Sequence, residues 1–108
     1  MVIILPEVQQ YFRELSYILY EKDYFGFLEA SEKYVEELVY DIKTTLPICL
    51  HKPAPKHFDR YGKGMYYASF RKNKNTQWYV FFRIYIENGE TFYQVRYIAN
   101  NHTVAQYL

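Results

Sequence analysis

The stretch from Gln77 to Ile98 predicts one long β-hairpin, because two runs rich in aromatic and β-branched residues flank Glu87-Asn88-Gly89-Glu90. Asn-Gly between such runs is a strong hairpin signal, since both turn positions need a positive φ. Side chains alternate between the two faces of a strand. The first strand therefore has one core face, formed by Trp78, Val80, Phe82, Ile84 and Ile86. Its other face has aromatic rings around an arginine, namely Tyr79, Phe81, Arg83 and Tyr85.

The same alternation is expected in two further strands. In the return strand one face is predicted to hold Tyr93, Val95 and Tyr97, and the opposite face to hold Phe92, Gln94, Arg96 and Ile98. Arg83 and Arg96 are then expected on the same side of the sheet. An earlier strand, Met65 to Arg71, would place Tyr66, Ala68 and Phe70 on one face and Met65, Tyr67, Ser69 and Arg71 on the other. The polar turn Lys72-Asn73-Lys74-Asn75 connects it to the hairpin.

The first half of the chain predicts a short strand and two helices. Met1 to Leu5 is an apolar run ended by Pro6, which suits a buried strand. Three-and-four spacing predicts a helix whose buried stripe is Val8, Tyr11, Phe12, Leu15, Ile18 and Leu19. After a break at Gly26, a second stripe is expected at Phe27, Ala30, Tyr34, Leu38 and Ile42, with a helix extending toward Leu46.

The order of these elements predicts an α+β fold in a single domain, residues 1–108. A helical hairpin would pack on one face of a mainly antiparallel sheet of four to five strands. Pro47 ends the second helix, and the prolines that follow predict an irregular segment or short edge strand over His51 to His57. The other sheet face is expected to be open and concave, with the C-terminal tail beside it.

Charge and tyrosine content suggest the kind of partner. Residues 1–50 have four Lys/Arg and nine Asp/Glu, whereas residues 51–108 have nine Lys/Arg and three Asp/Glu. A basic surface favours a polyanion, with nucleic acid as the first candidate, although a protein with an acidic tail fits equally well. The 14 tyrosines suit interfaces and base-stacking platforms.

Other features limit the function classes. The single Cys49 excludes an internal disulfide and is expected to be buried rather than nucleophilic. No apolar stretch approaches the roughly 20 residues of a membrane span, and the N-terminus lacks a basic signal-peptide region, so a cytoplasmic location is expected. His51 and His57 lie on a proline-broken segment without a Cys pair, so we expect no metal and no cofactor.

Several motifs of the second half occur together in one known family. Residues 78–85 are similar to a Tyr-Arg-x-x-Tyr-Arg-Ile pattern on a central strand, and an Asn-Gly turn follows. After Val95-Arg96-Tyr97-Ile98, a polar segment with Asn100-Asn101-His102 leads to a near-terminal Tyr107. In these motifs, and in its two leading helices, the chain resembles the RelE/ParE toxins of type II toxin-antitoxin systems.

The resemblance implies one of two activities. RelE-like members cleave mRNA in the ribosomal A site without a metal, and ParE-like members inhibit DNA gyrase. Both are neutralised by a cognate antitoxin whose extended or helical C-terminal segment wraps the toxin. We expect the first activity, with mRNA, the ribosome and an antitoxin as partners. A homodimer is expected when the antitoxin is absent, since exposed aromatic surfaces are commonly covered.

RNA cleavage by attack of the 2′-OH needs a base, an acid and cations around the phosphorane. The candidate catalytic residues are His102, Arg83, Arg96, Arg71 and Tyr107. His102 is the candidate acid or base because histidine exchanges protons near neutral pH, and the arginines could hold the phosphate. Tyr107 could donate a proton or stack on a base. The candidate RNA-binding residues are Tyr67, Lys72, Lys74, Tyr79, Phe81 and Tyr85.

Departures from the ribonuclease pattern leave alternatives open. Tyr67 and Ser69 stand where the best-known ribonucleases have lysines, and Tyr79 stands at the first arginine of the central-strand pattern. Asn100 and Asn101 replace basic residues after the last strand. A ParE-like gyrase inhibitor would need no acid-base pair. An inactive relative would use the tyrosine-rich face only to bind a partner protein.

Overall fold

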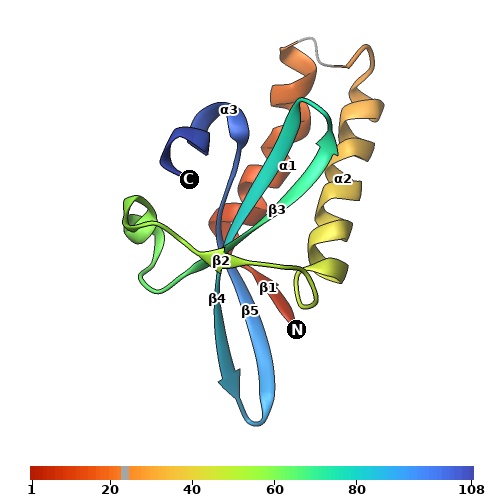
Figure 1. Ribbon diagram of the computed structural model, residues 1–108. Coiled ribbons are helices and arrows are strands. Elements are labelled where there is room, and N and C mark those ends of the chain that lie inside the picture. The colour runs from red at the N-terminus through yellow and green to blue at the C-terminus, as the bar shows by residue number, and fades with distance from the viewer. Residues whose placement is uncertain (23–24) are drawn as a thin grey trace.

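The computed structural model describes residues 1–22 and 25–108 as two helices packed on one side of a twisted sheet (Figure 1). The first half contains strand β1 (Val2–Ile4) and helices α1 (Pro6–Glu21) and α2 (Leu28–Thr45). The second half contains β2 (Lys52–Pro53), the 3₁₀ segment η1 (Lys56–Tyr61), β3 (Tyr66–Asn73), β4 (Thr76–Glu87) and β5 (Glu90–Asn100). The chain ends in a helical turn, α3 (Asn101–Val104), and a second 3₁₀ turn, η2 (Ala105–Tyr107).

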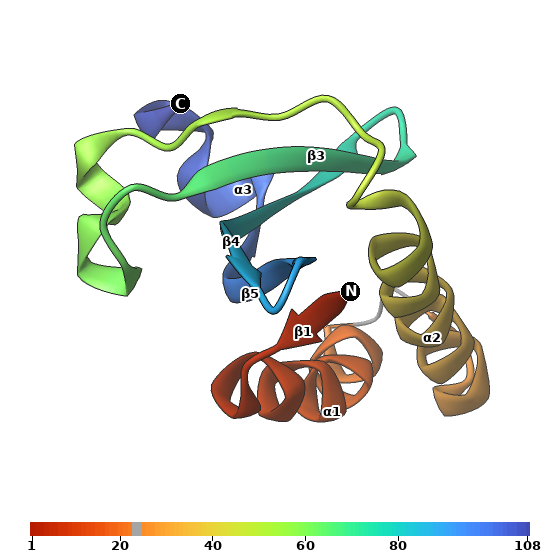
Figure 2. The ribbon, with the colours of Figure 1, turned by 90° about the horizontal axis from the view of Figure 1, so that it is seen from below.

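The five strands form one sheet in the order β1-β5-β4-β3-β2. β1 runs parallel to β5, and the other neighbours are antiparallel. Seen from below, both helices lie on one side of the sheet, and the segment containing η1 lies toward the other (Figure 2). The predicted α+β class is therefore confirmed, with a mainly antiparallel sheet under a helical hairpin.

The sequences of α1 and α2 explain where the helices begin and which of their residues are buried. Pro6 occupies the start of α1, where its missing N–H costs nothing, and Glu7 complements the positive end of the helix dipole. In α2 the buried residues are Ser31, Val35, Leu38 and Ile42. The predicted stripe was wrong at its start, because Phe27 precedes the helix and is 74% exposed, and Ala30 is also exposed. No helix among the described residues is long and apolar enough to cross a membrane.

The main core lies between the helices and the sheet face that they cover. Trp78, Val80 and Phe82 of β4 are almost fully buried there against α1 and α2. The indole N–H of Trp78 donates a hydrogen bond of 2.9 Å to the hydroxyl of Tyr34, so the one polar atom of this large side chain is paired. The core face predicted for β4 is thus confirmed for these three residues, and Ile84 is partly buried beside them. The prediction was wrong for Ile86, which is 73% exposed near the end of the strand.

The hairpin has the predicted turn, but its second strand departs from the predicted faces. Asn88 and Gly89 have φ values of 52° and 77°, as a tight hairpin requires. A β-bulge interrupts the pairing, because Phe82 pairs with Val95 while Phe81 pairs with Tyr97. Arg96 is the extra residue, and it shifts the alternation of every residue after it. The predicted faces were therefore wrong here: Tyr97 shares a face with Phe81, and Ile98 belongs to the main core.

The second sheet face is not fully open. A smaller core covers its centre and consists of Phe58, Met65, Phe81, Ala99 and Val104. Phe58 of η1 stacks on Phe81 at 4.3 Å between ring centroids, and Val104 comes from α3. The expectation of an open concave face was wrong for this centre, because the residues after Pro55 turn into η1 and bring an aromatic side chain onto the sheet.

Candidate nucleic-acid interface

The two layers of the molecule differ in charge. Most acidic residues lie on α1 and α2, and most basic residues lie on the strands, on η1 and in the connecting turns. Lys72 is an exception, because it points to the helices and pairs with Glu37 at 4.0 Å and with Asp41 at 3.8 Å. Its ammonium also lies 5.3 Å from the ring centre of Tyr34. The structure therefore places Lys72 on the opposite side from the other candidate RNA-binding residues.

Two candidate arginines lie together on the face away from the helices. Arg83 is exposed and pairs in register with Gln94. Arg96 donates from Nη1 to Oε1 of Gln94 at 2.9 Å and from Nε to the carbonyl of Tyr61 at 2.6 Å. We call Arg83, Gln94 and Arg96 the arginine row. Within residues 1–22 and 25–108, ion pairs within 4.0 Å involve Lys72 only, so no carboxylate there lies within ion-pair distance of the row.

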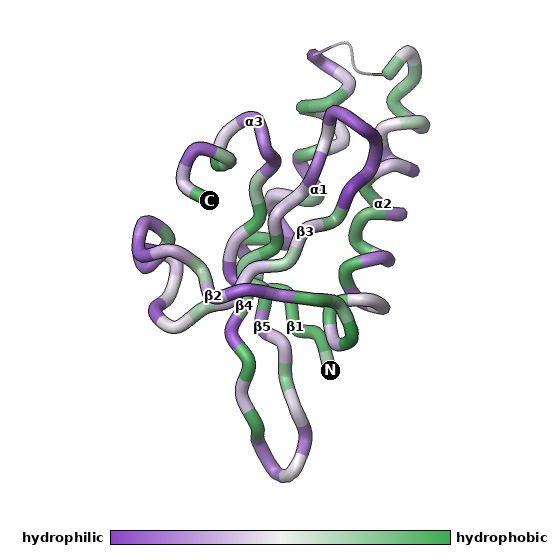
Figure 3. Tube along the Cα trace, in the orientation of Figure 1, coloured by the Kyte–Doolittle hydropathy of each residue, from purple (hydrophilic) through white to green (hydrophobic). Residues whose placement is uncertain are grey.

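Arg71 lies at another end of the same face. Its guanidinium donates to the carbonyls of Asn73 at 3.2 Å and Lys74 at 3.5 Å, which holds the β3–β4 turn in place. Lys74 is exposed in this turn, which is among the hydrophilic parts of the chain (Figure 3). Arg71 is separated along β3 from the arginine row, since it pairs in register with Gln77.

The candidate stacking residues differ in accessibility. Tyr67 and Tyr79 are half-buried neighbours with ring centroids 6.1 Å apart. Tyr85 stacks on Phe92 at 5.2 Å on the projecting part of the hairpin. Phe81 is 0% exposed, so it supports the rings around it and offers no face to a ligand. Three of the four predicted aromatic residues therefore remain accessible on this face.

The C-terminal candidates are arranged differently from the expectation. His102 is exposed and lies at a cavity of about 570 Å³ that also contacts α1 and Trp78. Tyr107 instead stacks on His57, with ring centroids 3.6 Å apart and planes 6° apart. From the sequence, His57 was assessed as a possible metal ligand and not as a neighbour of Tyr107. The two residues are fifty positions apart, so no local pattern could have predicted their contact.

A pair of stacked tyrosines lies beside the arginine row. The rings of Tyr61 and Tyr97 are 3.8 Å apart and tilted by only 5°. The pKa of Tyr97 is raised to about 12, mainly by burial and also by the neighbouring Tyr61 hydroxyl, while the charge of Arg60 opposes the shift. Tyr97 is therefore a neutral hydrogen-bonding group at physiological pH.

Residues suited to metal binding or thiol chemistry do not gather at this face. The described residues contain no cluster of three His, Cys, Asp or Glu side chains. Cys49 is half-buried, its thiol donates to the carbonyl of Leu46 at 3.4 Å, and burial raises its pKa. A raised pKa reduces the thiolate that a nucleophile would need.

The arrangement combines arginines with accessible rings, a combination that is typical of surfaces that bind single-stranded nucleic acids. The stacked His57 and Tyr107 both contact Phe58, which covers the same face at Phe81. Comparisons of the chain with protein-family models, with curated proteins and with solved structures found no match.

Proposed function

We propose that this protein is the toxin of a type II toxin-antitoxin system, a RelE-like endoribonuclease that cleaves mRNA on the ribosome in the cytoplasm. The observation that carries the proposal is the separation of charge between the two layers. The acidic helices lie on one side, and the arginine row lies on the other without a carboxylate partner among the described residues. A strand of RNA supplies the negative charge that this face lacks.

RNA would bind with its phosphates along the basic residues and its bases against the tyrosines. The exposed Arg83 and the half-buried Arg96 can each hold a phosphate oxygen, and planar guanidinium groups suit this geometry. Tyr67, Tyr79 and Tyr85 supply accessible rings. Stacking on a side chain contributes about 1–3 kcal/mol per base without strong sequence preference.

The chemical step can be assigned to the stacked pair. A base removes the proton of the ribose 2′-OH, whose oxygen attacks the adjacent phosphorus. The P–O5′ bond breaks, an acid protonates the leaving 5′-oxygen, and a 2′,3′-cyclic phosphate remains. We assign the base to His57 and the acid to Tyr107, because the two rings are stacked and both contact Phe58, which packs on Phe81 of the same sheet face. His102, the sequence-based candidate, borders the cavity near Trp78.

A ParE-like gyrase inhibitor is the second candidate, and one observation favours it. Arg71 and Arg96 already bind backbone carbonyls, so they organise the surface whether or not a phosphate is present. A preformed surface of this kind suits the binding of a protein without any chemical step. Both candidate functions include a cognate antitoxin that binds and neutralises the toxin.

The two candidates are separated by parallel assays of the purified chain. In the first, ribosomes carrying a defined mRNA are incubated with the wild type or Arg83→Gln, and new 5′ ends are mapped. In the second, the same proteins are added to gyrase during supercoiling. The proposal requires mRNA cleavage that Arg83→Gln reduces, with normal supercoiling. Inhibited supercoiling with intact mRNA would establish the gyrase alternative instead.

A further inference from the structure

Strand β5 extends well beyond the strand that covers its outer edge. β1 pairs with β5 only from Val2 opposite Tyr93 to Ile4 opposite Val95. The N–H of Leu5 then donates to the carbonyl of Val95 at 3.1 Å, and the chain turns into α1. In the described part of the chain, residues 96–100 of β5 consequently pair with β4 alone.

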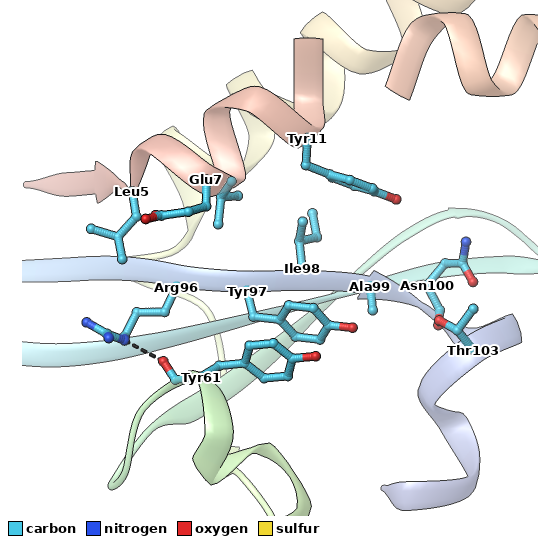
Figure 4. Close-up of a pocket in the computed structure, with 11 residues that line it drawn as sticks. Leu5, Glu7, Tyr11, Tyr61, Arg96, Tyr97, Ile98, Ala99, Asn100 and Thr103 are labelled. Atoms are coloured by element: carbon cyan, nitrogen blue, oxygen red, sulfur yellow. Dashed lines mark hydrogen bonds between the residues drawn. The ribbon is translucent and has the colours of Figure 1, made fainter. Parts of the chain in front are cut away.

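This uncovered edge lies at the floor of a groove. A cavity of about 600 Å³ runs along Arg96 to Asn100. Figure 4 shows α1, with Glu7 and Tyr11, on one side of β5 and Tyr61 of η1 on the other. Thr103 lies at the far end. We call this space the β5-edge groove.

The backbone at the floor is oriented toward the groove. Tyr93 donates to Met1, and Val95 accepts from Leu5, so the peptide groups of these two residues face the β1 side. Peptide groups alternate between the two edges of a strand, and the bulge at Arg96 shifts the alternation by one residue. The N–H and C=O of Ile98 are therefore the next groups to face this edge.

The opposite edge of the sheet is protected, and this edge is not. β2 covers only the start of β3, but the rest of β3 and its turn contain Arg71, Lys72 and Lys74, whose charges discourage strand pairing. The β5 edge instead has Ile98 and Ala99 at its centre, only 5% and 6% exposed. Arg96 lies only at the start of this stretch, so the central part of the edge is uncharged and can accept an added strand.

We propose that the β5-edge groove binds an extended segment of another polypeptide, which adds to the sheet as a strand beside residues 96–100. Its side chains facing α1 would be apolar, since Val8, Tyr11 and Ile98 line that wall. Its side chains facing η1 would be acidic or neutral, because Arg96 lines the groove beside Tyr61. The inference does not rest on RNA cleavage, which we assign to the face of the sheet.

A single strand fits this groove better than a second copy of the chain. The edge lies between α1 and η1 (Figure 4). A second copy that offered the same edge would bring its own α1 and η1 against these two walls. The uncovered stretch of five residues would span about 17 Å, which is the length of a short peptide strand.

The test uses the full-length chain and displayed libraries of short peptides. One library has apolar residues at alternate positions with Asp, Glu or neutral polar residues between them, and the other has Lys or Arg between them. The acidic library is expected to yield binders. The substitution Glu7→Trp fills the groove from the surface of α1 and should lower the affinity of these peptides at least tenfold. The control Gln10→Trp changes an exposed residue of α1 outside the groove and should leave their affinity unchanged.

The mode of binding is tested on the best peptide. N-methylation of successive peptide nitrogens should weaken binding at every second position, because only alternate N–H groups of an added strand pair with β5. Amide hydrogen exchange at Ile98 should be faster than at Ala99 in the free chain and should slow at least tenfold on binding. The proposal would be overturned if the acidic library yielded no binders, or if its peptides bound Glu7→Trp as tightly as the wild type. It would also be overturned if N-methylation weakened binding equally at every position.

Discussion

Tyr107 lies flat against His57, with 3.6 Å between the ring centroids. The stack joins the C-terminal turn η2 to the start of η1, and Phe58 contacts both rings from the side. Three aromatic contacts therefore hold these two side chains relative to each other. Their position is independent of His102, which belongs to a different cavity.

Tyr107→Phe separates the chemical role of this pair from its packing role. Phenylalanine preserves the stack but has no hydroxyl, so RNA affinity and the free energy of unfolding should change little. The single-turnover cleavage rate on programmed ribosomes should fall about 10²-fold to 10⁴-fold, as expected when an acid or base is removed. His57→Gln should behave similarly, and His102→Gln should cleave normally. Normal cleavage by Tyr107→Phe would remove its hydroxyl from the mechanism.

Arg83→Gln is expected to weaken RNA binding in a salt-dependent way. Arg83 is exposed on the face opposite the helices, and a phosphate that it neutralises would release counterions. The slope of log affinity against log salt concentration should decrease by about 0.7 for one contact to a single strand. Lys72→Gln is the matched control, because Lys72 pairs with Glu37 and Asp41 on the helical side. An equal loss in both variants would contradict the location of the site.

Gly62→Ala is expected to destabilise the protein by about 1–3 kcal/mol in urea unfolding. Gly62 has a φ of 145°, and a Cβ there would lie 2.6 Å from Nε of Arg96. Arg96 would have to leave the carbonyl of Tyr61, which its Nε binds. Gly26→Ala meets no atom within 4 Å and should change the free energy of unfolding by less than about 0.5 kcal/mol. Equal effects of the two variants would show that Arg96 tolerates displacement.

Tyr97 should make the stability of the fold depend on alkaline pH. Its pKa is raised from 10.0 to about 12 in the folded chain, mainly by burial. Between these values the unfolded chain releases the phenolic proton while the folded chain retains it. The free energy of unfolding should therefore be unaffected below pH 10 and fall as the pH rises toward 12. Tyr97→Phe should show a shallower fall over this range, and an unchanged slope would contradict the shift.

Local patterns were sufficient to predict both long helices and the central hairpin, but not η1, α3 or η2. Asn88-Gly89 marked the turn, and the turn residues have the positive φ values that this chemistry requires. Spacing of apolar residues identified both helices, and Val8, Phe12 and Leu15 of the first stripe are buried. Each of these signals operates between residues that are close in sequence.

Features that depend on distant residues were not predicted. The bulge at Arg96 has no marker in the sequence of β5, because Tyr61, the residue whose carbonyl it binds, lies 35 positions earlier. Nothing in the sequence around Phe58 predicted that its ring would stack on Phe81. The same holds for the contact between His57 and Tyr107, which are fifty positions apart in the chain.

The most direct test of the account is to induce the chain in bacteria and map the 5′ ends of cellular mRNAs over the first minutes. Ribosome-dependent cleavage predicts growth arrest with new ends spaced by codon within translated regions, and neither should occur with Tyr107→Phe. Arrest with intact mRNA and DNA damage would contradict the account and point to gyrase. Normal growth at high expression of the folded chain would contradict a toxin of either kind.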